Sequence, residues 1–172
     1  RLDVKLFDGG LGMSKEQLSS SAQKVQQALE ALGLALKVIE MPDSTRTAQE
    51  AAQAVDCEVG QIVKSLVFKT KRSRRPILVG ASGENRVNEK KLEQLLGEPL
   101  GKADADFVRE CTGFAIGGVP PVGHVQAIET FVGQDLLAYD SIWAAAGTPR
   151  SVFCLTPADL VKMTAGKVVD IS

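Results

Sequence analysis

A loop rich in glycine and proline is the segment of this sequence best suited to binding chemistry. Residues 113–124 read G-F-A-I-G-G-V-P-P-V-G-H, with four glycines and two adjacent prolines. Pro120 and Pro121 remove two backbone donors and fix two φ angles, so the segment predicts neither a helix nor an ordinary strand. Gly117 and Gly118 let a ligand or another backbone come close. Exposed N–H groups on such a loop suit a carbonyl, carboxylate or phosphate oxygen; a structural turn between strands is the alternative.

Lys64 is a second candidate, because it falls on the apolar face of a predicted strand. Residues 61–70 form the strongest strand pattern, and alternation places Ile62, Lys64, Leu66 and Phe68 on one face. A lysine there costs desolvation free energy unless an anionic group meets it, and burial lowers its pKa. Two alternatives stay open: an inward charge that protects a sheet edge, or a stem that reaches back to water.

Other catalytic chemistry is poorly represented. His124 is the single histidine, and a loop histidine serves packing more often than base catalysis. Cys57, Cys111 and Cys154 are far apart and lack the spacing of zinc ligands, and one histidine gives them little activation as nucleophiles. We therefore expect no metal and no cofactor.

The composition indicates one globular domain with a local basic patch. The chain has 172 residues, of which 44% are apolar and 5% aromatic, and its net charge is −1. Any contact with nucleic acid must therefore come from a local cluster. Lys69, Lys71, Arg72, Arg74 and Arg75 form such a run at a predicted hairpin end; a solvated hairpin end is the alternative. Unpaired thiols and the lack of a long apolar run predict a cytoplasmic protein with no membrane segment.

Capping and turn residues mark most of the elements. Residues 1–12 differ in character from the rest of the chain and read as a leader or added extension, with a first strand over Val4 to Phe7 as the alternative, and one domain covers 13–172. The expected helices begin at the capping boxes Ser14–Gln17 and Thr47–Glu50, at Asn88, at Asp104 and at Thr156–Pro157. The expected strands are 36–41, a hairpin of 61–70 with 76–81, a hairpin of 127–132 with 136–139, and a last strand at 151–155. Interleaved helices and hairpins predict a single α/β domain with a mixed, largely antiparallel sheet and surrounding helices.

Three separated motifs resemble one family. V-K-S-L-V-F at 63–68, the loop at 113–124 and W-A-A-A-G-T at 143–148 resemble the YbaK/ProX aminoacyl-tRNA deacylases, which also occur as the editing insertion of bacterial prolyl-tRNA synthetases. The resemblance runs from about Met13 to the C-terminus. The V-P-P-V-G-H form looks like the free-standing ProX-type branches. The YbaK branch has a Ser-Pro pair where Pro120 and Pro121 stand, which argues against its cysteine substrate.

The resemblance implies a mixed α/β fold that hydrolyses the ester of mischarged tRNA. The expected substrate is tRNA for proline carrying a small wrong amino acid such as alanine, serine, threonine or 2-aminobutyrate, with water activated largely by substrate groups and prolyl-tRNA synthetase as a partner. The implied roles are catalysis by Lys64 and Gly117, substrate binding by Gly118, Val119, Pro120, Pro121, His124, Gly147 and Thr148, and tRNA contact by Lys71, Arg72, Arg74 and Arg75. A non-catalytic module that binds tRNA, DNA or a synthetase is the alternative.

Overall fold

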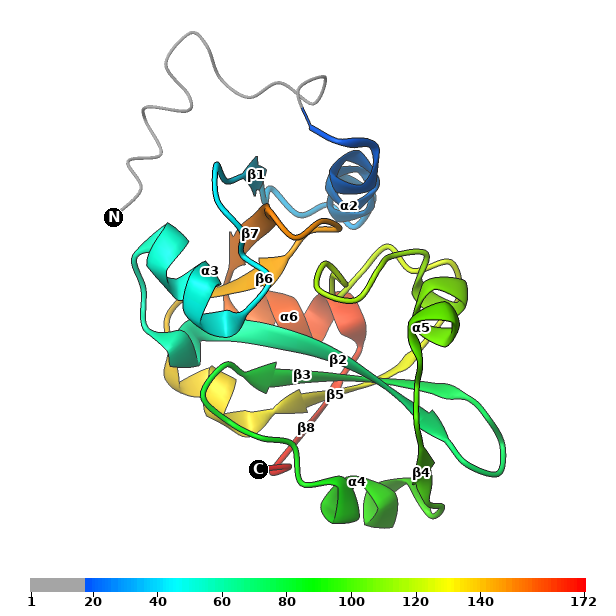
Figure 1. The fold of residues 1–172 in the computed structure, drawn as a ribbon. Helices are drawn as coiled ribbons and strands as arrows, with labels where there is room; N and C mark the ends of the chain where they lie inside the picture. Colours follow the sequence, from blue (N-terminus) through cyan, green and yellow to red (C-terminus); the bar gives the residue numbers. More distant parts are fainter. Residues whose placement is uncertain (1–17) are drawn as a thin grey trace, which may run out of the picture.

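One mixed sheet organises the part of the chain that the computed structural model describes, residues 18–172 (Figure 1). The expected leader and the capping box at Ser14 and Gln17 lie outside these residues. The spatial strand order is β1-β7-β6-β2-β3-β5-β8, with β4 paired to β2. The strands are β1 (Val38–Glu40), β2 (Ile62–Thr70), β3 (Pro76–Ser82), β4 (Leu100–Gly101), β5 (Glu129–Gly133), β6 (Ile142–Ala145), β7 (Ser151–Leu155) and β8 (Lys167–Val169).

The pairing confirms a mixed sheet in a single α/β domain. Within residues 18–172, β1–β7, β7–β6, β2–β3 and β2–β4 are antiparallel, whereas β6–β2, β3–β5 and β5–β8 are parallel. The predicted hairpin of 61–70 with 76–81 is present as β2 and β3. Two antiparallel groups, β1-β7-β6 and β2-β3, therefore meet at the parallel pair β6–β2, and the parallel strands β5 and β8 complete the sheet beyond β3.

Local side-chain caps begin the helices near the positions expected from the sequence. The helices are α2 (Ser20–Ala31), α3 (Ala48–Val55), α4 (Glu89–Leu96), α5 (Ala105–Thr112) and α6 (Pro157–Thr164). The Thr47–Glu50 capping box starts α3, and Asn88 and Asp104 cap α4 and α5. Ser19 caps α2. No helix within residues 18–172 has both the length and the apolar character that a bilayer span requires.

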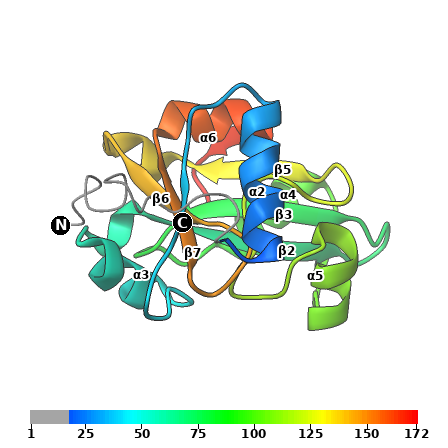
Figure 2. The ribbon, with the colours of Figure 1, turned by 90° about the horizontal axis from the view of Figure 1, so that it is seen from above.

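The helices cover both faces of the sheet (Figures 1 and 2). Alternation in β3 sends Leu78 toward the main core and Ile77 and Val79 toward the core beneath α4. The main core also takes buried residues from α2, α6 and the 113–124 loop. A third cluster packs the small face of α3, Ala51, Ala52 and Val55, against Ile62 and Val152. The loop is thus held by the largest core and not by a hairpin of its own.

The predicted hairpin of 127–132 with 136–139 is wrong. Residues 129–133 form β5, but Gln134–Ala138 is a 3-10 helix that places Leu136 in the core with no exposure. β5 lies between β3 and β8 and pairs with both in parallel, so neither edge is free for residues 136–139. The apolar residues at 136–139 were read as a strand, but Leu136 is apolar because it packs against the sheet.

The expectation that 151–155 is the last strand is also wrong. The chain leaves α6 through Ala165 and Gly166 and adds β8 beside β5. Lys167 and Val168 are exposed, so this three-residue edge strand carries no alternation of apolar and polar residues that would reveal it. Its pairing depends on β5, which is distant in sequence.

Candidate active site

The centre of β2 has a strand on only one of its two edges. β3 pairs with β2 from Val63 to Lys69. On the other edge, β6 pairs only with Ile62 and Val63, and β4 only with Lys69 and Thr70. Within residues 18–172, the edge of β2 over residues 64–68 therefore has no strand partner. We call this segment the open β2 edge.

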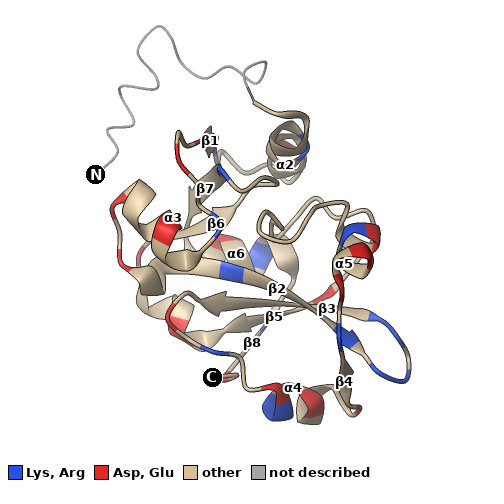
Figure 3. Ribbon diagram, in the orientation of Figure 1, with Lys and Arg blue, Asp and Glu red and all other residues tan. Residues whose placement is uncertain are grey.

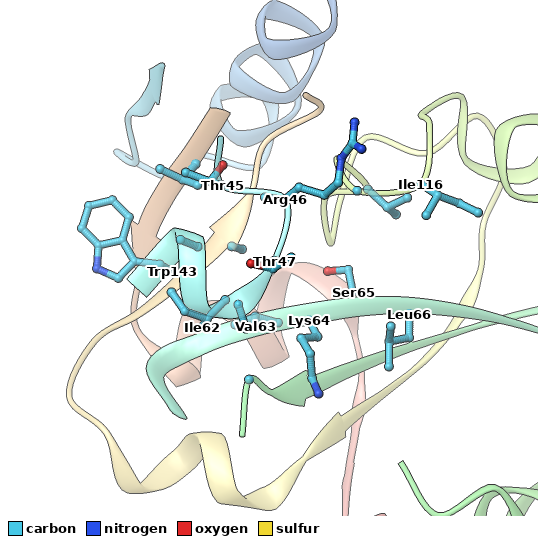
Figure 4. A pocket seen from close by; sticks show the side chains of 18 of the residues that line it. Thr45, Arg46, Thr47, Ile62, Val63, Lys64, Ser65, Leu66, Ile116 and Trp143 are labelled. Atoms are coloured by element: carbon cyan, nitrogen blue, oxygen red, sulfur yellow. The ribbon is translucent and has the colours of Figure 1, made fainter. Parts of the chain in front are cut away.

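A cavity of about 620 Å³ lies along the open β2 edge (Figure 4). This volume falls within the usual range for small-molecule sites, roughly 300–1,000 Å³. Its apolar floor includes Val55, Ile62, Trp143 and Val152, contributed by α3, β2, β6 and β7. The N-terminal approach to α3 and the 113–124 loop form the opposite wall, through Thr45 to Ala48 and through Ile116, Gly117 and Val119. Five segments distant in sequence thus meet around one partly open cavity.

Gly117 requires the backbone conformation that glycine allows. Its φ is +95°, in a region that residues with a Cβ rarely adopt. A Cβ at this position would lie 3.1 Å from Cγ and 3.2 Å from Nε of Arg46. The N–H of Gly118 donates to the Ala115 carbonyl at 3.1 Å. The Gly118 N–H is therefore occupied inside the loop, which leaves Gly117 as the better candidate donor to a ligand.

The W-A-A-A-G-T segment supports the glycine loop from behind. Gly147 N–H donates to the Gly118 carbonyl at 2.9 Å, and a Cβ on Gly118 would lie 2.9 Å from the backbone of Thr148. The Thr148 hydroxyl lies 2.5 Å from that of Ser151. Ala144 and Ala145 line the cavity, whereas Gly147 and Thr148 stand behind the loop. Gly147 and Thr148 therefore support the glycine loop and do not line the cavity.

Arg46 is a site residue that sequence reasoning missed. It lies over Gly117, and it is both exposed and in the cavity wall, which places it at the mouth. Figure 4 shows its guanidinium directed away from β2. Trp143 and Ser65 were also missed as wall residues. The Ser65 hydroxyl is buried and has no hydrogen-bond partner within residues 18–172. The sequence around Arg46 gives no sign of a functional role, because Arg46 directly precedes the Thr47–Glu50 capping box, which accounts for this segment as the start of α3.

Lys64 lies in the cavity wall, but its ammonium turns to the other side of β2. Figure 4 shows Lys64 pointing away from Ser65 and Arg46. Its Nζ donates to the main-chain carbonyl of Asn85. Burial, followed by the nearby Arg86, lowers the pKa of Lys64. The structure thus brings Lys64 into the same wall as Gly117 without placing the ammonium beside the glycine loop.

His124 and the prolines belong to the loop's interior. A ring nitrogen of His124 lies 2.7 Å from the Pro120 carbonyl oxygen, and burial lowers the pKa of the imidazole. His124 and Pro121 line a separate recess with Val125, whereas Val119 faces the cavity. His124 therefore fixes the loop, and the cavity wall within residues 18–172 contains no histidine, aspartate or glutamate.

The thiols are poor nucleophiles. Burial raises the pKa of Cys57 to about 11 and also raises the pKa values of Cys111 and Cys154. No group of three or more potential metal-ligating His, Cys, Asp or Glu residues occurs in the described chain. The chemistry available in the wall is hydrogen bonding, shape and positive charge.

The basic hairpin end projects from the sheet beyond the cavity (Figure 3). Lys71, Arg72 and Arg74 are exposed, three to six residues past Phe68, which is the last β2 residue in the cavity wall. Arg75 forms an ion pair with Glu129, and Glu98 accepts the N–H groups of Arg72 and Ser73. Three of the four predicted tRNA-binding side chains therefore remain exposed, and the fourth is engaged within the protein.

Comparison with known proteins agrees with this arrangement. The chain belongs to the aminoacyl-tRNA editing domain family, whose profile matches residues 42–163. That range contains the cavity wall, the glycine loop and the basic hairpin.

Individual relatives are described in related terms. A crystal structure provisionally described as a trans-editing enzyme for prolyl tRNA synthetase is 52% identical, has a TM-score of 0.86, and covers 90% of this chain and 98% of its own. The uncharacterised protein YwhH of Bacillus subtilis is 30% identical over 131 residues, 76% of this chain and 83% of YwhH. EbsC of Enterococcus faecalis, provisionally a Cys-tRNA(Pro)/Cys-tRNA(Cys) deacylase, is 25% identical over 130 residues, 73% of this chain and 77% of EbsC.

Proposed function

We propose that this protein hydrolyses the ester of mischarged tRNA for proline that carries a small wrong amino acid. The observation that carries the proposal is the cavity of about 620 Å³ along the open β2 edge, walled by the glycine loop. A module that only binds tRNA or DNA would need the basic hairpin but not a cavity of this size. A cavity of this volume suits a ligand of small-molecule size, such as the aminoacyl ester at the end of a tRNA.

The wall favours a mechanism in which the protein positions the ester and the substrate activates the water. Water attacks the ester carbonyl carbon, and the bond from that carbon to the ribose oxygen breaks. The neighbouring hydroxyl of the terminal ribose takes the proton from water and passes its own proton to the leaving ribose oxygen, since the described wall offers no acidic or histidine side chain as a base. The Gly117 N–H stabilises the developing oxyanion, which is the part of acyl transfer that preorganised donors accelerate most.

Positive charge near the cavity would hold the phosphates of the 3′ end. Arg46 stands at the mouth, and Lys64 can swing about its flexible stem from Asn85 toward an anionic group. Lys71, Arg72 and Arg74 continue the cationic path away from the cavity. This surface fits an RNA that enters end first, with prolyl-tRNA synthetase as the source of mischarged tRNA in the cytoplasm.

The amino acid should be small and should not be proline. The rigid loop of glycine, valine and proline limits the space beside the ester, and a clash discriminates more strongly than the roughly 1–3 kcal/mol of a missing methylene. Alanine, serine, threonine and 2-aminobutyrate therefore fit better than larger residues. The proline ring constrains its amine and does not suit a slot for a free amino group.

A panel of esters on one tRNA tests the proposal. Alanyl-, seryl-, threonyl-, 2-aminobutyryl-, cysteinyl- and prolyl-tRNA for proline are incubated with the chain under one condition, and the remaining ester is measured against time. We expect hydrolysis of at least one small ester and sparing of the prolyl ester. Tight tRNA binding without hydrolysis of any ester would favour the non-catalytic module. Rapid loss of the prolyl ester would contradict an editing role.

A further inference from the structure

The main chain of the open β2 edge presents hydrogen-bonding groups to the cavity. Thr70 N–H donates to the Arg75 carbonyl on the β3 side, whereas Lys71 N–H donates to the Pro99 carbonyl on the opposite side. Successive residues of a strand turn their main-chain groups to opposite edges. The β2–β3 register is unbroken from Val63 to Lys69, so steps of two from Lys71 place the N–H and C=O groups of Ser65 and Val67 on the open edge. Both residues line the cavity.

The open β2 edge is the continuation of a parallel ladder that the protein leaves unfinished. β6 pairs in parallel with β2 at Ile62↔Trp143 and Val63↔Ala144. If this register continued, residue 147 would lie opposite Leu66. Instead Ala146 N–H bonds to the Ser151 carbonyl, and Gly147 N–H bonds to the Gly118 carbonyl. β6 thus stays with β7 and departs from β2 where the cavity begins.

The gap before β4 has the length of a short strand segment. It covers residues 64–68, about 17 Å at the usual rise per residue. Unpaired main-chain groups on a strand edge are a template for an added strand, and peptide ligands use such edges elsewhere. In a parallel ladder, the residue opposite Leu66 would donate its N–H to the Ser65 carbonyl and accept from the Val67 N–H.

We propose that the aminoacyl group of the substrate binds as that missing residue, opposite Leu66. Its α-ammonium donates to the Ser65 carbonyl, and its ester carbonyl accepts from the Val67 N–H. This inference rests on the proposed deacylase function and specifies how the site recognises an α-amino acid. It gives the ester carbonyl a second main-chain donor in addition to Gly117.

The charges around the cavity agree with this orientation. Within residues 18–172 no carboxylate lines the wall, so the ammonium must be met by neutral acceptors. The unpartnered Ser65 hydroxyl lies at the same residue as the proposed carbonyl acceptor, and binding would supply the hydrogen bond that it lacks. Arg46 stands across the cavity at the mouth, where phosphate rather than ammonium is favoured. The ester is thereby oriented with its amine toward β2 and its ribose toward the mouth.

Esters that differ only at the α-amine test this proposal. Alanyl-, lactyl- and propionyl-tRNA for proline carry an ammonium, a hydroxyl and a hydrogen at the same carbon. Each single-turnover rate is divided by the uncatalysed rate of the same ester. We expect the propionyl ester to lose at least about 100-fold, with the lactyl ester between the two, because sites built for a donor reject analogues that lack it. Equal ratios for alanyl and propionyl esters would overturn the proposal while leaving the deacylase function intact. Failure to hydrolyse even the alanyl ester, or any other small ester, would reject the function itself.

A backbone substitution offers an independent test. Val67→Pro removes the N–H on the open edge without removing a β2–β3 hydrogen bond, and Val67→Ala is the matched control that retains it. We expect Val67→Pro to hydrolyse alanyl-tRNA at least about tenfold more slowly than Val67→Ala, with thermal unfolding confirming that both are folded. Equal rates would overturn the proposal. If Val67→Pro does not fold, the three esters still decide it.

Discussion

Replacing Gly117 with alanine tests whether the 113–124 loop takes part in catalysis or is only a structural turn. Gly117 has a φ of +95°, and the new Cβ would lie 3.1 to 3.4 Å from Cγ, Nε and Cδ of Arg46. The backbone strain costs about 1–2 kcal/mol for a residue with a Cβ. Arg46 is exposed and flexible, so it gives way at little further cost in stability. A shift of the loop by ~1 Å would slow the reaction on the order of 100-fold, or about 2.7 kcal/mol in the barrier.

Gly33→Ala is the matched control. Gly33 has a φ of +74°, and a Cβ there meets no atom within 4 Å. Both variants should lose about 1–2 kcal/mol in urea unfolding. Only Gly117→Ala should slow single-turnover deacylation of alanyl-tRNA. The reasoning is refuted if folded Gly117→Ala retains the wild-type rate, or if Gly33→Ala loses the same activity.

Three further predictions concern the charged and titratable groups. Replacing Lys71, Arg72 and Arg74 with glutamine should make the slope of log K against log salt for tRNA binding shallower by about 2. Arg75→Gln, which breaks the ion pair with Glu129, should change that slope less. An unchanged slope in the triple variant would favour a solvated hairpin end. Burial lowers the pKa of His124 below 6.5, so its contribution to the free energy of unfolding is present above about pH 6.5 and is lost as the pH falls through the folded-state pKa. Between about pH 7.5 and pH 5, the free energy of urea unfolding should fall less in His124→Gln than in the wild type. Equal falls would contradict the assignment. Arg46→Ala should weaken binding of alanyl-tRNA while preserving the unfolding midpoint, and an unchanged Michaelis constant would remove Arg46 from the substrate path.

Local signals in the sequence predicted the helix starts well. Thr47 with Glu50, Asn88 and Asp104 each bond to a backbone N–H three residues on, so neither the cap nor its effect needs the rest of the fold. The β2–β3 hairpin was predicted for the same reason, since two adjacent strands pair across a short turn. The strand at β5 was also predicted, but its parallel pairing and the strand β8 were not, because both depend on partners distant in sequence.

The candidate site was predicted in part, and the missing part is topological. Lys64, Gly117 and Val119 were expected and lie in the cavity wall. The open β2 edge exists because β6 and β4 each pair with only two residues of β2, which no local pattern reveals. Ser65 lies in that gap, and Arg46 lines the same cavity from the segment before α3. His124, in contrast, was expected at the substrate and is instead bonded to Pro120 inside the loop.

The most direct test of the account is the rate at which this chain hydrolyses alanyl-tRNA for proline, measured with Lys64→Ala beside the wild type. We expect the wild type to cleave the alanyl ester and to spare the prolyl ester. Folded Lys64→Ala should lose most of the activity, because the lysine serves the substrate's charge. Near-normal turnover by folded Lys64→Ala would mean that Lys64 has only a structural role, through its hydrogen bond to the Asn85 carbonyl. A wild-type chain that leaves the alanyl ester and every other small ester intact would contradict the central claim.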